Sequence, residues 1–265
     1  MQVHRTTVTL QHKSFITPNF LRLVLHCDTI DIYKDVPIGV NNKLFIPPKG
    51  HSTVAIPTFN AEKKVWEIEN EALRPTVRTY THRAIDLEAQ TLTVDFAVHD
   101  GDTVACDWAL TANIGDEIGL AMKLSHRDVL PAVDHFLFVT DMTGIPVVAS
   151  LVKSLPKNAT ATIVTEVLTP EDILESHYAS DATLTLEWLI NPTPHEGSIL
   201  SKQAITHWES MPAPHFTHIT AEYSTVKTLR DFLRHEKGQT KETFFACAYW
   251  QIDKREDEAR EKRLD

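Results

Sequence analysis

Two patterns of hydrophobic and polar positions follow one another along this chain, and the change falls near residue 130. Before it, short runs rich in β-forming residues are separated by turn signals. The runs at 65–69 and 92–98 alternate with period two, as half-buried strands do, and Pro47-Pro48 ends the run at 43–46. Several short strands of this kind predict a closed or nearly closed antiparallel barrel.

The second part of the chain has a different rhythm, in which strand-like runs alternate with helical spacing. The run at 136–140 is continuously apolar, which is typical of a strand buried on both faces. Further strands are predicted at 161–165, 184–190, 218–221 and 244–250, with helices at 144–155 and 198–208. A last helix is expected to start at Ser224 as its N-cap and to end at Gly238. The alternation predicts a parallel sheet covered on both faces.

Length and composition fit two domains. The chain has 265 residues, of which 42% are apolar, and this is enough for two packed cores. We expect a barrel domain at 1–128, an α/β domain at 129–252 and a charged stretch at 253–265. In that stretch Glu256 and Arg260 have i,i+4 spacing, which predicts a solvated terminal helix.

Charge and cysteine usage exclude several classes of function. A net charge of −10 argues against nucleic acid as a partner. No apolar run is long enough to span a membrane, and the first residues lack the apolar core of a secretory signal. The three cysteines lie far apart, which favours a reducing compartment such as the cytoplasm. The histidines form no H-E-x-x-H motif, so no metal site built by the protein is expected.

The segment from Arg78 to Arg83 has residue types suited to a flavin. An aromatic ring can lie against the isoalloxazine, a hydroxyl can bind its N5 region, and a guanidinium can hold the pyrophosphate. Alternation along a strand would place Arg78 and Tyr80 on one face and Thr81 and Arg83 on the other. Taken alone, the segment fits an ordinary barrel strand better than a flavin site.

The order of several motifs resembles the siderophore-interacting protein family, which are flavin reductases of ferric siderophores in the ferredoxin-reductase superfamily. The resemblance covers residues 5–257. It comprises R-x-Y-T-x-R at 78–83, the L-D-F-V-x-H strand at 92–99, the D-E-T-A-L-P turn at 141–146 and the G-Y-W ending at 248–250. At 103–108 the family pattern G-P-A-x-x-W keeps Trp108 but loses Gly-Pro. The resemblance implies a Greek-key FAD-binding barrel followed by a nicotinamide-binding-like α/β domain.

The resemblance also implies which residues bind the cofactors. The backbone around Asp95 would meet the pyrimidine edge of FAD, the amides of Ala105 and Cys106 would receive the pyrophosphate, and Trp250 would cover the flavin opposite Tyr80 unless it only packs in the core. The implied set is Arg78, Thr79, Tyr80, Thr81, Arg83, Asp95, Phe96, Ala97, Val98, His99, Ala105, Cys106, Trp108, Asp141, Thr143, Tyr249 and Trp250.

Three lysines match the family's basic residues for substrate. Lys43, Lys123 and Lys254 would attract an anionic ferric chelate, although three separate solvated lysines are the alternative. A lysine where the family has arginine at position 123 offers a point charge and no bidentate fork.

The implied activity is reduction of Fe(III) to Fe(II) in a siderophore by FAD, with electrons from NADH or NADPH. One added electron weakens the preference of iron for hard oxygen ligands, so the metal can leave the chelator without a catalytic acid or nucleophile. Ferredoxin is the alternative donor, because members of the family use either NAD(P)H or ferredoxin, and the absence of a G-x-G-x-x-G fingerprint does not decide between them. A flavin reductase for another acceptor and a siderophore-binding carrier without turnover are the competing functions. A monomer is expected.

Overall fold

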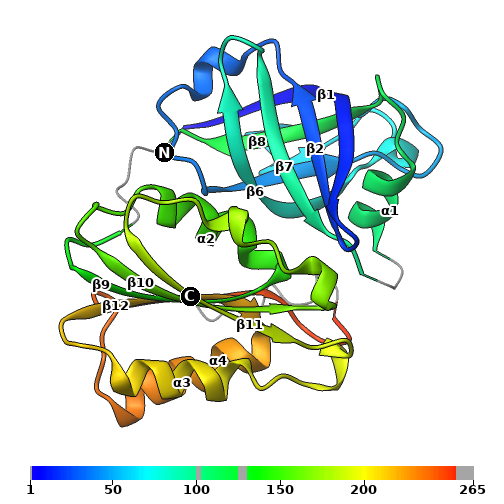
Figure 1. The fold of residues 1–265 in the computed structure, drawn as a ribbon. Coiled ribbons are helices and arrows are strands. Elements are labelled where there is room, and N and C mark those ends of the chain that lie inside the picture. Colours follow the sequence, from blue (N-terminus) through cyan, green and yellow to red (C-terminus); the bar gives the residue numbers. More distant parts are fainter. Residues whose placement is uncertain (1, 100–102, 125–129, 255–265) are drawn as a thin grey trace. The chain divides into compact units, whose positions relative to one another are not determined.

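The computed structural model describes residues 2–99, 103–124 and 130–254 of the chain. The chain forms two compact units, residues 1–127 and 128–265, which Figure 1 draws as a ribbon. The terminal helix predicted around Glu256 and Arg260 lies outside the described residues. No helix within those residues is long and apolar enough to cross a membrane.

Six strands in the described part of the first unit close into an antiparallel barrel, in the order β1-β2-β7-β6-β3-β8 (Figure 1). Because β7 and β6 lie between β2 and β3, the order is of the Greek-key type. The antiparallel barrel predicted from the sequence is confirmed. The strands are β1 (Val3–Thr17), β2 (Phe20–His26), β3 (Asn41–Ile46), β6 (Thr76–Asp86), β7 (Thr91–Ala97) and β8 (Glu117–Lys123).

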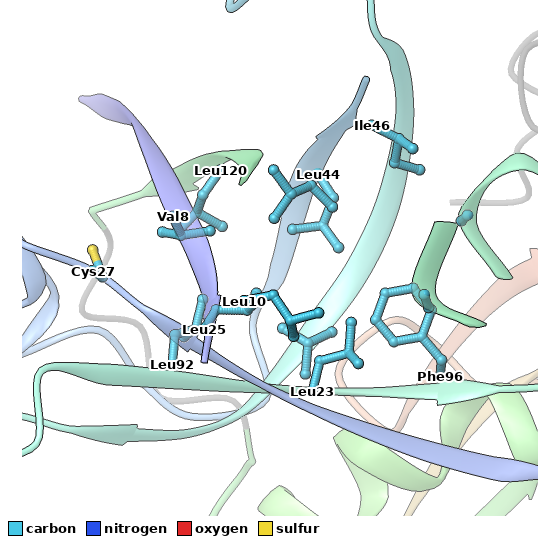
Figure 2. Close-up of a cluster of buried hydrophobic side chains, with 14 of the residues drawn as sticks. Val8, Leu10, Leu23, Leu25, Cys27, Leu44, Ile46, Leu92, Phe96 and Leu120 are labelled. Atoms are coloured by element: carbon cyan, nitrogen blue, oxygen red, sulfur yellow. The ribbon is translucent and has the colours of Figure 1, made fainter. Parts of the chain in front are cut away.

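The apolar side chains at alternate positions of the barrel strands fill the barrel interior. Leu10, Leu23 and Leu44 come from three different strands and are completely buried, and Figure 2 shows their side chains gathered with Phe96 inside the barrel. Each such side chain contributes about 1.5–3 kcal/mol through burial. The helix α1 (Val104–Thr111) adds Trp108 to the same cluster, so this helix is fixed against the barrel by its own apolar face.

Two predicted elements of this unit are wrong. The strand β5 (Val65–Glu67) pairs only with β4 (Thr58–Asn60), and both Val65 and Trp66 are exposed, so the run at 65–69 is not a half-buried barrel strand. Its period-two pattern reflects a two-stranded ribbon instead. The segment at 103–108, expected as a turn, enters helix α1.

The described part of the second unit contains a five-stranded sheet in the order β11-β10-β9-β12-β13, and all its pairings are parallel. Figure 1 shows α2 on one face and α3 with α4 on the other, which confirms the predicted covered sheet. The elements are β9 (His135–Asp141), α2 (Ile145–Lys153), β10 (Thr160–Val167), β11 (Thr183–Ile190), α3 (Leu200–Ser210), β12 (His215–Glu222), α4 (Tyr223–Asp231), a π-helical turn η7 (Phe232–Glu236) and β13 (Phe244–Trp250).

Short 3-10 turns join these elements. They are η1 (Ile30–Tyr33) and η2 (Glu71–Leu73) in the first unit, and η3 (Met142–Gly144), η4 (Pro170–Asp172), η5 (Glu175–Tyr178) and η6 (Pro194–Glu196) in the second.

The predicted cap of the last helix is also wrong. Ser224 lies inside α4, and the N-cap is Glu222, whose carboxylate accepts a hydrogen bond from the backbone N–H of Ser224. A carboxylate can take this place because the N-terminus of a helix favours negative charge. Gly238 follows η7 with a φ of +65°, and this left-handed conformation fits its predicted role in ending the helix.

Burial of His218 on β12 makes the stability of the second unit depend on pH. Its ring stacks on Phe245 with centroids 4.8 Å apart, its Nδ1 is buried without a hydrogen-bond partner, and burial lowers its pKa to about 3. The unfolded chain binds the proton from about pH 6.5 downward, so stability is lost as the pH falls from 6.5 towards 3.

We expect His218→Phe to remove this part of the pH dependence. The free energy of unfolding of the natural protein, relative to that of the variant, should fall by about 2 kcal/mol between pH 6.5 and pH 4.5. Urea unfolding of both proteins at several pH values measures this difference. The exposed His12 provides the control: His12→Phe should leave the pH slope unchanged. Parallel slopes for the natural protein and His218→Phe would contradict the assignment.

Candidate functional site

The ladder between β6 and β7 stops partway along the barrel. Among the described residues, the pairing runs from Asp86–Thr91 to His82–Val94 and then ends. Beyond this point β6 pairs only with β3, and β7 only with β2. The facing edges of 76–81 and 95–97 therefore have no ladder between them, and we call this opening the seam.

The predicted flavin residues of β6 lie along the seam. Arg78 pairs with the buried Leu44, and Tyr80 pairs with the buried Asn42. Arg78 and Tyr80 therefore lie on the face of β6 that points into the barrel. The ring of Tyr80 lies against Phe96, with centroids 4.2 Å apart. Both Arg78 and Tyr80 are half-buried, which leaves part of each side chain accessible to a ligand.

Thr79 and Thr81 lie on the face of β6 that points away from the barrel interior. The hydroxyl of Thr79 accepts a hydrogen bond from Lys43, and that of Thr81 donates to Asn41. The predicted pairing of Thr81 with Arg83 on one face is interrupted, because the register shifts between His82 and Ala84 and Arg83 lies at that irregularity.

The predicted residues of β7 face the same opening from the other side. The Asp95 carboxylate is held by Arg22 of β2 through two hydrogen bonds of 2.7 Å, so only the backbone of Asp95 remains for a ligand. The sequence analysis missed Arg22, although its position opposite Asp95 follows from the β2–β7 register. Phe96 is buried, Ala97 and Val98 are half-buried, and His99 is exposed.

The N-terminus of α1 lies beside the end of β7. Its first intrahelical hydrogen bond runs from Asp107 N–H to Thr103 C=O, so the amides of Val104, Ala105 and Cys106 precede the helical ladder. Thr103 caps the helix without a side-chain hydrogen bond. These amides, which include the two predicted donors, lie at the start of a helix and not in a turn, and such a helix N-terminus can bind an anion.

The Cys106 thiol connects this helix to the seam. Burial raises its pKa, while the nearby polar groups of Thr103, the His99 backbone and the Tyr80 side chain oppose the rise. Its Sγ also lies 3.3 Å from the carbonyl oxygen of Ala97. The residues predicted from three separate motifs therefore meet around one buried thiol.

These residues fit FAD. The backbone of 95–98 can meet a flat heteroaromatic edge, Tyr80 offers a ring, and the α1 amides with Arg78 can hold phosphate. The set contains an aromatic ring, a guanidinium and a helix N-terminus on adjoining elements, and these groups suit the isoalloxazine ring and the pyrophosphate of FAD.

In the second unit the predicted residues lie where the strand order reverses, between β9 and β12, which is the usual ligand edge of such a sheet. Asp141 ends β9, accepts hydrogen bonds from the N–H and hydroxyl of Thr143, and accepts one of 2.8 Å from the indole of Trp250. Burial raises its pKa, and these hydrogen bonds oppose the rise. Tyr249 is half-buried on β13.

Two carboxylates at this edge lie outside the predicted set of site residues. Glu166 pairs in register with Asp141, and Glu222 ends β12; both side chains are buried. Burial raises the pKa of Glu166, and the nearby Asp141 carboxylate adds to the rise. The signal was available, because each acidic residue lies at or near the end of a predicted strand in the α/β part of the chain.

The three predicted substrate lysines have different surroundings. Lys43 is half-buried and donates to Thr79 beside the seam. Lys123 is exposed at the end of β8. Lys254 is exposed in the second unit, in a turn closed by a bridge to Gln251.

Comparison with known proteins agrees with this geometry. Residues 9–122 match the siderophore-interacting FAD-binding domain, and residues 133–253 match the siderophore-interacting protein domain. The ferric vibriobactin reductase of Vibrio cholerae is 24% identical over 99% of this chain and 95% of its own. An NADPH-dependent ferric-chelate reductase of Escherichia coli is 29% identical over 89% of this chain and 88% of its own.

Solved structures share the fold. The siderophore-interacting protein SipS of Aeromonas hydrophila superposes with a TM-score of 0.77 at 23% identity, covering 98% of this chain and 96% of its own. Because the two matched domains span most of the chain, and the first of them is an FAD-binding domain, the expectations of FAD and of the family are both confirmed. The chain belongs to the siderophore-interacting protein family.

Proposed function

We propose that this protein is an FAD-dependent reductase of ferric siderophores, which releases iron by reducing Fe(III) to Fe(II). The observation that carries the proposal is the seam, where Arg78, Tyr80 and the N-terminus of α1 converge beside Lys43. The names of the Vibrio and Escherichia relatives support the same reaction.

Each part of the barrel site has a task in this proposal. Arg78 and the amides of Val104, Ala105 and Cys106 hold the pyrophosphate, and Tyr80 supports the flavin ring from the barrel side. The backbone of 95–98 meets the pyrimidine edge, His99 approaches a phosphate, and Thr81 lies near N5. When bound, FAD would accept two electrons as one hydride and release them one at a time. Lys43, Lys123 and Lys254 attract an anionic chelate to the exposed edge.

We propose NADH or NADPH as the donor, with ferredoxin as the alternative. The name of the Escherichia relative supports NADPH. The donor would meet the carboxyl edge near Asp141, Thr143, Tyr249 and Trp250. Since Asp141 already accepts the Thr143 N–H, and carboxylates repel phosphate, this turn suits the nicotinamide end of the donor better than its pyrophosphate.

The proposal also covers the cellular compartment and the oligomeric state. Cys27, Cys106 and Cys247 are all free thiols, which supports a reducing compartment, and we propose the cytoplasm. A monomer would suffice, because the barrel residues assigned to FAD all come from one unit.

The central experiment follows the flavin through one cycle. The purified protein should be yellow, should bleach without oxygen when NADPH or NADH is added, and should regain its colour when a ferric siderophore is added with a ferrous trap. Reduced ferredoxin is tested in parallel to assign the donor. If no ferric chelate restores the yellow colour, the protein binds without turnover and the reductase proposal fails. If only free flavin or an oxygenase partner restores the colour, the protein serves another acceptor.

A second experiment tests the helix N-terminus as the pyrophosphate site. Val104 is exposed at the first position of α1, where proline fits a helix, and Thr103 already has the extended backbone that precedes proline. Val104→Pro removes one amide donor, so we expect FAD affinity to fall about ten-fold, as for loss of one hydrogen bond to a charged group. FAD titration of the apoprotein measures the change.

The matched control is Val104→Ala, which shortens the same side chain and keeps the N–H. It should bind FAD as the natural protein does, and thermal unfolding should show that both variants fold. Equal FAD affinity for the proline and alanine variants would exclude this amide from the cofactor site.

A further inference from the structure

A lysine of β1 reaches the C-terminal end of helix α1. The Nζ of Lys13 donates hydrogen bonds to three backbone carbonyls at that end, those of Leu110 at 2.8 Å, Ala112 at 2.7 Å and Ala109 at 3.4 Å. Figure 1 shows α1 beside the strands β1 and β2. The last carbonyls of a helix have no partners within the helix, and a cation is favourable there because this end is the negative pole of the helix dipole.

An irregularity in β1 turns Lys13 toward this helix. Leu10 pairs with the buried Leu25 of β2, and after a register shift Lys13 pairs with the buried Leu23. Residues opposite one another on paired strands project to the same face. Because of the shift, Leu10 and Lys13 both point inward although they are three residues apart. Ala109 of α1 belongs to the same core cluster as Leu23, so the half-buried ammonium enters the side of the wall that α1 covers.

The position of α1 depends on contacts with the barrel. The helix is only eight residues long, and a helix of this length is marginal without packing. Thr103 at its N-cap makes no side-chain capping bond, and its last turn contains no basic residue of its own. Ala105, Trp108 and Ala109 hold its apolar side against the barrel core. Lys13 adds a polar anchor at the C-terminal end.

The other end of α1 carries the amides assigned to the pyrophosphate of FAD. These amides can bind the pyrophosphate only while they point at it, because a hydrogen bond weakens steeply with angle. The eight residues of α1 span about 12 Å, so a tilt of about 10° at the C-terminal end moves the amides by about 2 Å. A hydrogen bond does not survive such a shift. A direct attraction between Lys13 and phosphate is weak at this separation, which exceeds the screening length of about 8 Å at physiological salt.

We propose that Lys13 is a positioning residue for FAD: it fixes the C-terminal end of α1 and thereby directs the amides of the N-terminal end at the pyrophosphate. The proposal rests on the proposed function only in placing the pyrophosphate at this N-terminus. Lys13 is then important for a flavin that carries phosphate and unimportant for one that lacks it. A lysine that only stabilised the barrel would affect both flavins equally.

The test compares FAD with riboflavin, which has the same ring system and no phosphate. Lys13→Met keeps most of the apolar stem of the side chain and removes the ammonium. We expect it to weaken FAD binding about ten-fold, in line with the loss of a partly buried cation from a helix C-terminus, and to leave riboflavin binding within about two-fold. The change in flavin fluorescence during titration of the apoprotein gives both dissociation constants.

Three further variants control this comparison. Lys13→Arg keeps the charge and several donors, so it should recover most of the FAD affinity. Lys13→Gln keeps a donor without the charge, and it takes the place of Lys13→Met if thermal unfolding shows that the methionine variant does not fold. Lys157→Met removes an exposed lysine of the second unit with the same change in net charge, and it should bind both flavins as the natural protein does.

A double variant tests the route from Lys13 to the pyrophosphate. If Lys13 acts through the α1 amides, the loss of one amide matters less once the helix is no longer held in place. Val104→Pro should therefore weaken FAD binding less in the Lys13→Met background than in the natural protein, because changes that act through one element are not additive. This measurement uses FAD only, so it decides the question even where riboflavin binds too weakly to measure.

The proposal is overturned if Lys13→Met binds FAD as the natural protein does, if it weakens FAD and riboflavin equally, or if its effect and that of Val104→Pro simply add. A loss of FAD affinity in Val104→Pro with none in Lys13→Met would leave the pyrophosphate site in place and refute only the role of Lys13. None of these measurements involves a ferric chelate, so failure of the reductase function is a separate result.

Discussion

The end of the β6–β7 ladder at His82 and Val94 is the constraint on which the barrel site depends. A closed barrel normally satisfies every strand edge with a neighbour. Here the closure holds elsewhere around the barrel, and the two strands part over only a few residues. The barrel core keeps the opening rigid, because Phe96 and Leu44 are buried on either side of it.

In the second unit, the ligand edge of the sheet depends on buried carboxylates. Asp141, Glu166 and Glu222 lie at the carboxyl edge of the sheet, and burying a carboxylate is costly unless it is hydrogen-bonded. Each one has such a partner: Trp250 for Asp141, Ser198 for Glu166 and Ser224 for Glu222. These bonds connect the end of β9 to β13, the end of β10 to the segment before α3, and the end of β12 to the first turn of α4. The edge is thereby ordered in the absence of a glycine-rich phosphate loop.

Much of this arrangement could be predicted from the sequence, because hydrophobic period and apolar runs are local properties. The strands around Arg78 and Asp95 and the parallel sheet followed from such patterns. The helix α1 did not, since its eight residues are few and Thr103 makes no capping bond that would mark its start. The seam, the Arg22–Asp95 pair and the register shift at Arg83 depend on which distant strands pair and where. No local pattern specifies that.

Strand alternation explains how one short segment can serve two ligands. Along β6, Arg78 and Tyr80 have inward parity beside the seam, while Thr79 between them points outward to Lys43. Successive residues along a strand are separated by about 3.3 Å. A cofactor held by side chains on the inner face of β6 and a chelate attracted to the outer face need therefore be only a few ångströms apart along the strand. The same rule extends the outward row through Ala121 to Arg5. Residues that are scattered over the first 121 positions of the chain thus form a single row across the barrel wall, and the spacing of that row is set by backbone hydrogen bonds and not by flexible side chains.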